Sequence, residues 1–238
     1  MSHMIETLDH IRDTAKIVDL SYTFHPDMPA WPTQPRFQSN VYNSQEYGDG
    51  SFHCSIHMSE HTGTHVDAPK HFIVGGESID RVDVRQLMGR GVMVDATSTP
   101  ACEAYPLEKL LAFEAANGPF CKNDIVMFRF GWDLRYGLRP EGASYLIDWP
   151  GLSPECAQYL KDKGVQAVGC DALALDPFPS EDFPCHTILL GSNILILENL
   201  CNLDKLPVHS YVIGLPHKYY GGSGSPVRIV AFCEPERT

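Results

Sequence analysis

Short apolar runs recur along the chain, and most are bounded by glycine, proline or aspartate, which is the pattern of β-strands. The runs are rich in valine, isoleucine and phenylalanine, residues that strands favour. They predict strands at Lys16–Tyr22, Ser51–Met58, Gly91–Ala96, Asp124–Phe130, Val165–Cys170, Ile194–Leu197, Ser210–Leu215 and Val227–Phe232.

Two segments between these runs carry the signals of helices. The first extends from Pro106 to about Asn117, with a proline in its first turn and Gly118 as a stop signal. The second extends from Pro154 to Lys163, with Ser153 as N-cap and Gly164 as C-cap. Both are amphipathic, and one face of the first helix is expected to carry Leu107, Leu110 and Leu111.

Strands alternate with helices over the middle of the chain, which predicts an α/β core. The two ends are denser in strands and suggest a second sheet, so we expect a single domain with two packed sheets and flanking helices. No linker divides the 238 residues. We assign residues 16–238 to this domain and residues 1–15 to an N-terminal tag remnant and arm, because Met1-Ser2-His3-Met4 is typical of a cloning scar.

Composition excludes several classes of protein. The hydrophobic share of 43% and the charged share of 20% are ordinary for a soluble protein, and no apolar run approaches the roughly 18 residues that a membrane span needs. A net charge of -12 opposes binding to nucleic acid or to an anionic membrane. The N-terminus shows no secretory signal, so we expect a cytoplasmic protein. Its eight cysteines include no C-x-x-C pair and are expected to be reduced and buried.

The segment His61–His71 concentrates candidate metal ligands, because it places three histidines and an aspartate within eleven residues. Imidazole and carboxylate suit zinc, manganese or Fe(II), and the lack of thiolates argues against a closed structural zinc site. A glycine and a proline within the segment disfavour a helix. If the chain is extended here, the even spacing of His61, His65 and Asp67 places them on one face. An idle histidine-rich surface is the alternative, but the interleaved glycine, threonine and proline favour a metal site.

His186 and Glu198 are further candidates for the same site. Glu198 ends an apolar strand-like run, and His186 precedes another apolar stretch. Taken alone, His186 is equally well explained as a hydrogen-bonded structural histidine, and Glu198 as an exposed residue at the end of a strand. Only their combination with the first segment points to a site.

These motifs occur in an order that resembles a known family. The pattern H-x-G-T-H-x-D-x-P-x-H is its most specific part, and the individually weaker blocks are Asp19-Leu20-Ser21, Met28–Pro32, Gly169-Cys170-Asp171, Asp176-Pro177, His186 with Leu189-Leu190, Glu198-Asn199-Leu200, Leu215-Pro216 and Gly221–Arg228. Over nearly its whole length the chain is similar to the cyclase family of metal-dependent hydrolases, which includes bacterial kynurenine formamidase and isatin hydrolase.

The resemblance implies a swivelling β/β/α fold and a homo-oligomer, a dimer or larger. His61, His65 and Asp67 match the family's first metal ligands. In formamidase-like members a second ion is held by residues matching Asp67, His186 and Glu198, whereas isatin-hydrolase-like members hold one manganese ion. The resemblance therefore implies zinc or manganese, at one or two ions per chain. It also implies that His71 is the catalytic proton-transfer residue, with Glu198 as a ligand or an assisting base.

The expected chemistry is hydrolysis by a metal-activated water, whose pKa an ion can lower to about 7. An imidazole with an ordinary pKa of about 6.5 suits His71 for delivering a proton to the leaving nitrogen of an amide. The small-molecule substrate implied by the family is an aryl formamide or a cyclic amide, N-formylkynurenine or an isatin-like compound, with a lactone as the alternative. Trp31, Phe24 and Trp132 are candidates for holding a flat substrate, although such aromatics more often belong to the core. Trp31 is favoured because it lies in the loop of residues 23–40, whose four prolines make it a candidate lid.

Two rival functions remain open at this point. His65, Asp67 and His186 also match the facial triad of Fe(II) oxygenases. The oxygenases that use 2-oxoglutarate normally place an arginine after the distal histidine, and residues 187–202 contain no arginine or lysine. The other rival is a catalytically silent metal-binding protein of the same fold. Retention of His71 and of both carboxylates argues against it.

Overall fold

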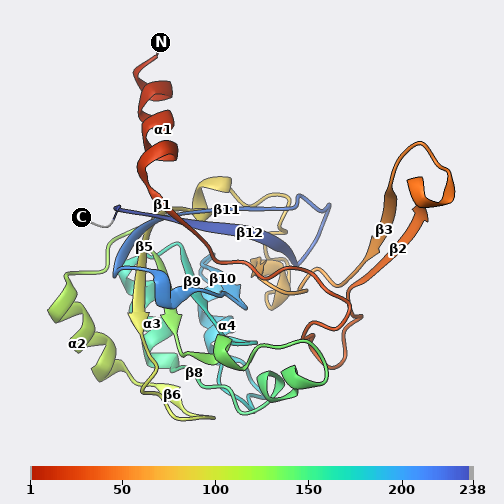
Figure 1. Ribbon diagram of the computed structural model, residues 1–238. Coiled ribbons are helices and arrows are strands. Elements are labelled where there is room, and N and C mark those ends of the chain that lie inside the picture. Colours follow the sequence, from red (N-terminus) through yellow and green to blue (C-terminus); the bar gives the residue numbers. More distant parts are fainter. Residues whose placement is uncertain (1, 236–238) are drawn as a thin grey trace.

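The computed structural model describes residues 2–235, and Met1 and residues 236–238 lie outside the described residues. Its centre is one eight-stranded sheet with the order β1-β12-β11-β5-β7-β9-β10-β4 (Figure 1). An additional pairing of β4 with β12 closes seven of these strands into a barrel-like sheet. The strands are β1 (Lys16–Asp19), β4 (His65–Asp67), β5 (Met88–Asp95), β7 (Ile125–Arg129), β9 (Ala167–Cys170), β10 (Leu195–Glu198), β11 (His209–Pro216) and β12 (Gly224–Cys233).

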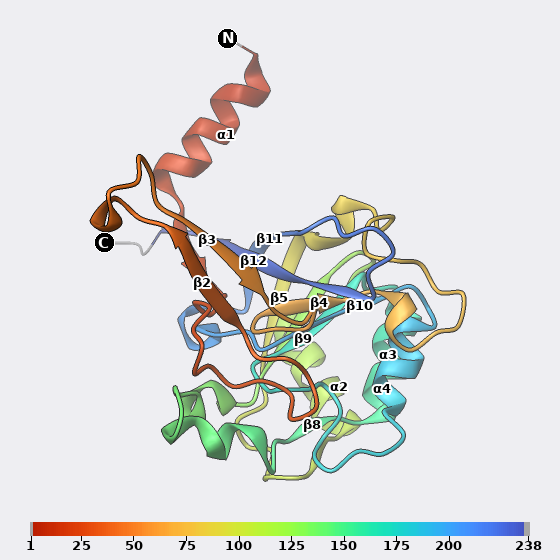
Figure 2. The same cartoon turned by 90° about the vertical axis from the view of Figure 1, so that its right-hand side faces the viewer.

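Strand alternation divides the core into two parts. Ile125 and Met127 of β7 point into the barrel. There they belong to the same apolar cluster as Val66 of β4. Val126 and Phe128 face outward and pack against three helices. These helices are α2 (Leu107–Asn117), α3 (Pro154–Lys163) and α4 (Pro184–Leu190), and they flank the parallel strands β5, β7, β9 and β10 (Figure 2).

Two elements project from this body (Figures 1 and 2). Helix α1 (His3–Thr14) has no buried residue, and strands β2 (Gln38–Asn43) and β3 (His53–His57) form a separate antiparallel ribbon. A second small sheet pairs β6 (Ala104–Tyr105) with β8 (Gly151–Leu152). Short 3-10 helices cover Gln45–Tyr47, Pro69–His71, Val84–Leu87, Trp132–Arg135, Glu141–Leu146 and Leu203–Lys205.

The predicted strands are all present with shifted ends. The first predicted helix is present as Leu107–Asn117, and the second has the predicted ends Pro154 and Lys163 with Ser153 and Gly164 as its caps. The expectation of two packed sheets is wrong, because strands from both ends of the chain pair with the central strands and close one sheet. In α2, Leu110 is buried as expected, but Leu111 is 42% exposed. The swivelling β/β/α description and the division at residue 15 stay predictions. Within residues 2–235, no helix is both long enough and apolar enough to cross a membrane.

Candidate metal centre

The pairing of β4 with β10 creates the centre of the site. Glu198 lies directly opposite His65 in this antiparallel ladder, and Ile196 lies opposite Asp67. Opposite residues share a face of the sheet, so both carboxylates and the imidazole emerge on the outer face, away from the barrel interior. His65, Asp67 and Glu198 are all buried there.

His61 reaches the site through a turn rather than along a strand. The strand β4 begins only at His65, and Gly63 has a φ of 65° in the left-handed region. A Cβ at Gly63 would lie 2.8 Å from the Met28 Cε atom. The expectation of an extended chain from His61 to Asp67 is therefore wrong, yet His61 Nδ1 still lies 2.7 Å from Asp67 Oδ1.

His186 is brought in by the first turn of α4, which begins at Pro184. Asp176 caps this helix by accepting the backbone N–H groups of Cys185 at 2.9 Å and of His186 at 3.2 Å. The same carboxylate accepts from His186 Nδ1 at 2.6 Å. The other ring nitrogen, Nε2, therefore faces Glu198 Oε1 at 3.1 Å and Asp67 Oδ2 at 3.5 Å.

These residues fit a divalent metal ion. The ligand atoms of His61, His65 and Asp67 lie within 4.8 Å of one another, and so do those of Asp67, His186 and Glu198. His65 Nδ1 is held by the Gly63 carbonyl at 2.8 Å, which leaves its Nε2 atom facing both carboxylates. The buried Asp67 Oδ2 atom has no hydrogen-bond partner, as expected of an oxygen aimed at a cation. Asp67 belongs to both groups.

The electrostatics favour a cation at this point. Burial alone would raise the pKa of Asp67, but the surrounding imidazoles hold that pKa well below its ordinary value. Burial would lower the pKa of His186, but three nearby carboxylates, Asp176 first and then Asp67 and Glu198, raise it well above its ordinary value. The cluster thus combines carboxylate charge with imidazole lone pairs, the donor set that zinc and manganese accept.

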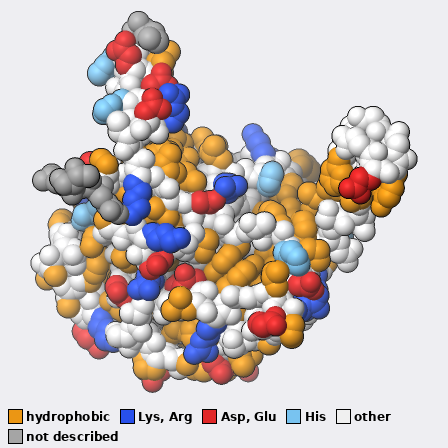
Figure 3. Space-filling model, viewed as in Figure 1, with side chains coloured by type: hydrophobic (Ala, Val, Ile, Leu, Met, Phe, Trp, Pro, Cys, Tyr) orange, Lys and Arg blue, Asp and Glu red, His pale blue; other side chains and the backbone are white. Residues whose placement is uncertain are grey.

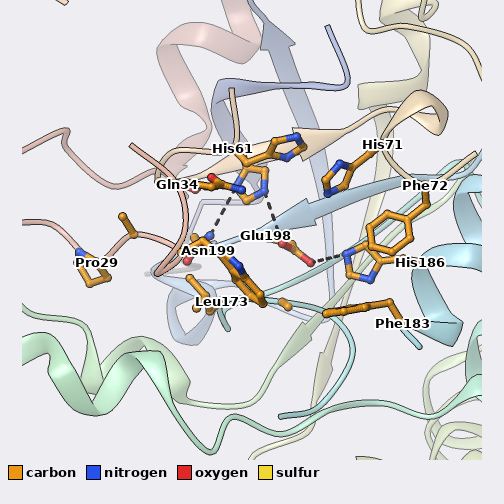
Figure 4. Close-up of a pocket in the computed structure, with 15 residues that line it drawn as sticks. Pro29, Gln34, His61, His71, Phe72, Leu173, Phe183, His186, Glu198 and Asn199 are labelled. Carbon is orange, nitrogen blue, oxygen red and sulfur yellow. Dashed lines mark hydrogen bonds and ion pairs between the residues drawn. The ribbon is translucent and has the colours of Figure 1, made fainter. Parts of the chain in front are cut away.

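His71 lies beside the ligands but belongs to neither ligand group. It ends the 3-10 helix Pro69–His71, and its ring stacks on that of His61 with centroids 4.0 Å apart. His71 lines the cavity and keeps part of its surface exposed, but partial burial lowers its pKa, so the ring is neutral near pH 7. Figure 4 shows it next to His61 and Phe72, above His186 and Glu198 in that view. This position suits a proton-transfer residue.

A cavity of about 220 Å³ opens onto these groups (Figure 4). Trp31, Phe72 and Phe183 form its aromatic part: the Phe183 ring centroid lies 5.6 Å from that of Phe72 and 6.4 Å from that of Trp31. None of the described residues that line the cavity is a lysine or an arginine. Its lining is made of Pro29, Ala30, Trp31, Gln34, His61, Gly63, His65, His71, Phe72, Leu173, Ala174, Phe183, His186, Glu198 and Asn199.

The structure places two of the aromatic candidates elsewhere. Phe24 is not among the lining residues; it stacks on Phe37 with centroids 5.4 Å apart. Trp132 is buried and donates to the Tyr145 carbonyl at 3.1 Å. Phe72 follows the histidine motif directly, a signal that could have singled it out. Phe183 and Gln34 carried no comparable signal.

Comparison with known proteins decides the family. The family model described as "Putative cyclase" matches residues 18–177. The chain belongs to the cyclase family. Isatin hydrolase of Roseibium aggregatum is 32% identical over 91% of both chains. Kynurenine formamidase of Salinibacter ruber is 29% identical over 92% of this chain and 99% of its own length.

Solved structures of cyclase-family relatives share the fold. Isatin hydrolase A from Labrenzia aggregata, bound to benzyl benzoate, matches with a TM-score of 0.87 at 28% identity over 98% of this chain and 100% of its own. An isatin hydrolase bound to the product analogue thioisatinate matches with a TM-score of 0.90 at 25% identity, with the same coverage. The named relatives are hydrolases.

Proposed function

We propose that this protein is a metal-dependent hydrolase that cleaves the amide bond of a small, flat substrate, an isatin-like cyclic amide in preference to an aryl formamide. One observation carries the proposal: two ligand groups share the buried Asp67 and open into a cavity with aromatic walls, with His71 beside them. A divalent ion held by these groups would supply a water of lowered pKa and a Lewis acid for the scissile carbonyl.

The side chains of the chain itself supply the remaining functions. Phe72, Phe183 and Trp31 offer apolar ring faces to an aromatic substrate and keep bulk water from it. Neutral His71 accepts a proton from the attacking water and delivers it to the amide nitrogen as the C–N bond breaks. Zinc or manganese, at one or two ions per chain, is part of this proposal.

The cavity supports a neutral substrate over N-formylkynurenine. Free N-formylkynurenine carries an ammonium and a carboxylate group, and a carboxylate that enters a small cavity needs a cationic partner. The described lining offers imidazoles at the ligand cluster, with Gln34 and Asn199 as its side-chain amides. An uncharged bicyclic amide can bind in this cavity without an arginine or a lysine as a partner.

A substrate screen tests the proposal. Protein loaded with zinc or manganese is assayed against isatin, N-formylkynurenine and simple lactones, with elemental analysis of the same samples. We expect the isatin-like amide to be hydrolysed fastest. Turnover of lactones alone would assign a lactone hydrolase, and bound metal without turnover would assign a silent metal-binding protein. Oxygen consumption with Fe(II) would assign the oxygenase class.

We also propose a homo-oligomer, a dimer or larger. Helix α1 exposes Ile5 and Leu8, and the β2–β3 ribbon exposes Tyr42 and Ile56, as Figure 3 illustrates by the apolar side chains along the ribbon. Such surface on projecting elements is typical of contacts with a second copy. Light scattering measures the mass directly, and a particle of 26.5 kDa would contradict this proposal.

A further inference from the structure

Glu60 holds the hydroxyl group of Ser223 in one orientation. The Ser223 Oγ atom donates to Glu60 Oε1 at 2.6 Å, and the Ser223 backbone N–H donates to Glu60 Oε2 at 3.0 Å. Gly222 permits this approach, because a Cβ there would lie 2.8 Å from Glu60 Oε2. An ionised carboxylate only accepts hydrogen bonds. The single hydroxyl hydrogen of Ser223 is therefore committed to Glu60.

This orientation determines the tautomer of His61. Ser223 Oγ also lies 2.9 Å from His61 Nε2, and with its hydrogen already committed it can only accept from that nitrogen. His61 Nε2 must therefore carry the ring hydrogen. Without an ion, the 2.7 Å contact of Nδ1 with Asp67 Oδ1 is a hydrogen bond, so the ring then carries a hydrogen on both nitrogens. Once Nδ1 gives up its hydrogen, the ring with Nε2–H is the form whose Nδ1 lone pair can ligate an ion together with His65 and Asp67.

We propose that Glu60 is a positioning residue that acts through Ser223 to keep His61 in the tautomer able to ligate a metal ion. The inference rests on the metal centre of the proposed function and is independent of the substrate. Each of the other two ligand histidines is fixed by one direct acceptor, the Gly63 carbonyl for His65 and the Asp176 carboxylate for His186. His61 instead depends on a relay of two side chains, and the relay can be reversed by changing one atom.

Glu60→Gln is that change. The glutamine oxygen can accept from the Ser223 backbone N–H while its NH₂ group donates to Ser223 Oγ. The hydroxyl hydrogen is then free to turn toward His61 Nε2, which favours the Nδ1–H tautomer. A protonated Nδ1 atom cannot bind a metal ion. The substitution nearly preserves size, so it tests hydrogen-bond direction rather than packing.

Two measurements test the relay without a substrate. Imidazole NMR of ¹⁵N-histidine-labelled, zinc-loaded protein reports which nitrogen of His61 carries the hydrogen. Competition with a chelator gives the zinc affinity. We expect an Nε2–H signal for His61 in the unmodified protein, and zinc binding that is about 10–100-fold weaker in Glu60→Gln and Ser223→Ala. Ser223→Thr, which keeps the hydroxyl group, should retain most of the affinity. Glu77→Gln, at an exposed carboxylate, is the matched control.

Two results would overturn the relay. An Nδ1–H signal for His61 in the zinc-loaded, unmodified protein would do so even if every variant failed to fold. Unchanged zinc affinity in both Glu60→Gln and Ser223→Ala would also overturn the relay. Failure to hydrolyse any amide would contradict the proposed function but leave the relay intact, because neither readout involves turnover.

Discussion

Asp176 binds His186 twice, through the ring Nδ1 atom at 2.6 Å and through the backbone N–H at 3.2 Å. One carboxylate therefore fixes both the start of α4 and the direction of its imidazole. Oδ2 accepts from both His186 donors, and Oδ1 accepts from the Cys185 backbone N–H. We expect Asp176→Asn to weaken metal binding by about 10–100-fold, because the asparagine side chain has only one oxygen for these two positions. Chelator competition measures the loss, with Asp162→Asn on the surface of α3 as the control. Equal affinity in the two variants would show that Asp176 acts only as a helix cap.

The second ligand group predicts the number of ions. His186→Ala and Glu198→Gln each remove a donor from the group that Asp67 shares, so we expect each to lower the metal content from two ions per chain to one. Elemental analysis of dialysed protein gives the count. If it stays at one ion per chain in the unmodified protein and in both variants, the first group alone binds metal.

His71 should separate catalysis from metal binding. His71→Ala leaves both ligand groups intact, so metal content should be unchanged while the rate on amides falls by about 10²–10⁴-fold. An ester should lose less, because its alkoxide or phenolate leaves with less need of a proton than an amine does. Metal content and kcat on both substrates are measured on the same preparation. Loss of metal would make His71 a ligand, and equal losses on both substrates would confine its action to the attacking water.

The environment of His71 predicts an acid limb in the pH profile. Burial lowers its pKa from the ordinary value of 6.5, so the ring stays neutral as the pH falls to 6.5 and becomes protonated only at lower pH. A protonated imidazole cannot accept the proton of the attacking water, so kcat/KM on an amide should fall at acid pH, with an inflection below 6.5. This inflection should disappear in His71→Ala while metal content at each pH is monitored. If the inflection persists in His71→Ala, the fall of kcat/KM at acid pH arises from protonation of the metal ligands.

Removal of the metal should affect both stability and activity. An ion that binds only the folded chain stabilises it by about 2.7 kcal/mol at a concentration 100-fold above its Kd. Without the ion, Asp67 and Glu198 remain buried close together. We expect chelation to abolish hydrolysis and to lower the melting temperature, and calorimetry with and without added zinc or manganese tests this. Full activity after exhaustive removal of metal would contradict the proposed function.

Local patterns predicted the parts of this molecule that are contiguous in sequence. Apolar runs identified strands such as Ile125–Arg129, and the motif at His61–His71 placed three ligands and His71 within one segment. The apolar pattern did not predict strand β4, because this strand has only three residues and its pairing partners lie far along the chain. The closure of the barrel depends on that strand, so it could not be predicted either.

The remainder of the site depends on contacts between distant segments. His186 and Glu198 were singled out individually, but only the β4–β10 register shows why they meet Asp67. Asp176 and Ser223 lie within matched motifs, yet nothing local indicates which imidazole each one holds. The partner of a hydrogen bond across such separations is decided by tertiary packing, which a single sequence does not display.

The position of β4 also affects how the protein is made. Its first ligand group is synthesised early, but β10 and β12, which flank β4 on its two sides, come from the last part of the chain. During translation His65 and Asp67 therefore have no neighbouring strands until the polypeptide is nearly complete. Contacts between such remote segments form slowly, because a long loop must close before any of them stabilises the chain. Asp67 can meet His186 and Glu198 only late in synthesis, so we expect a metal site that uses both groups to be completed at the end of the maturation of this protein.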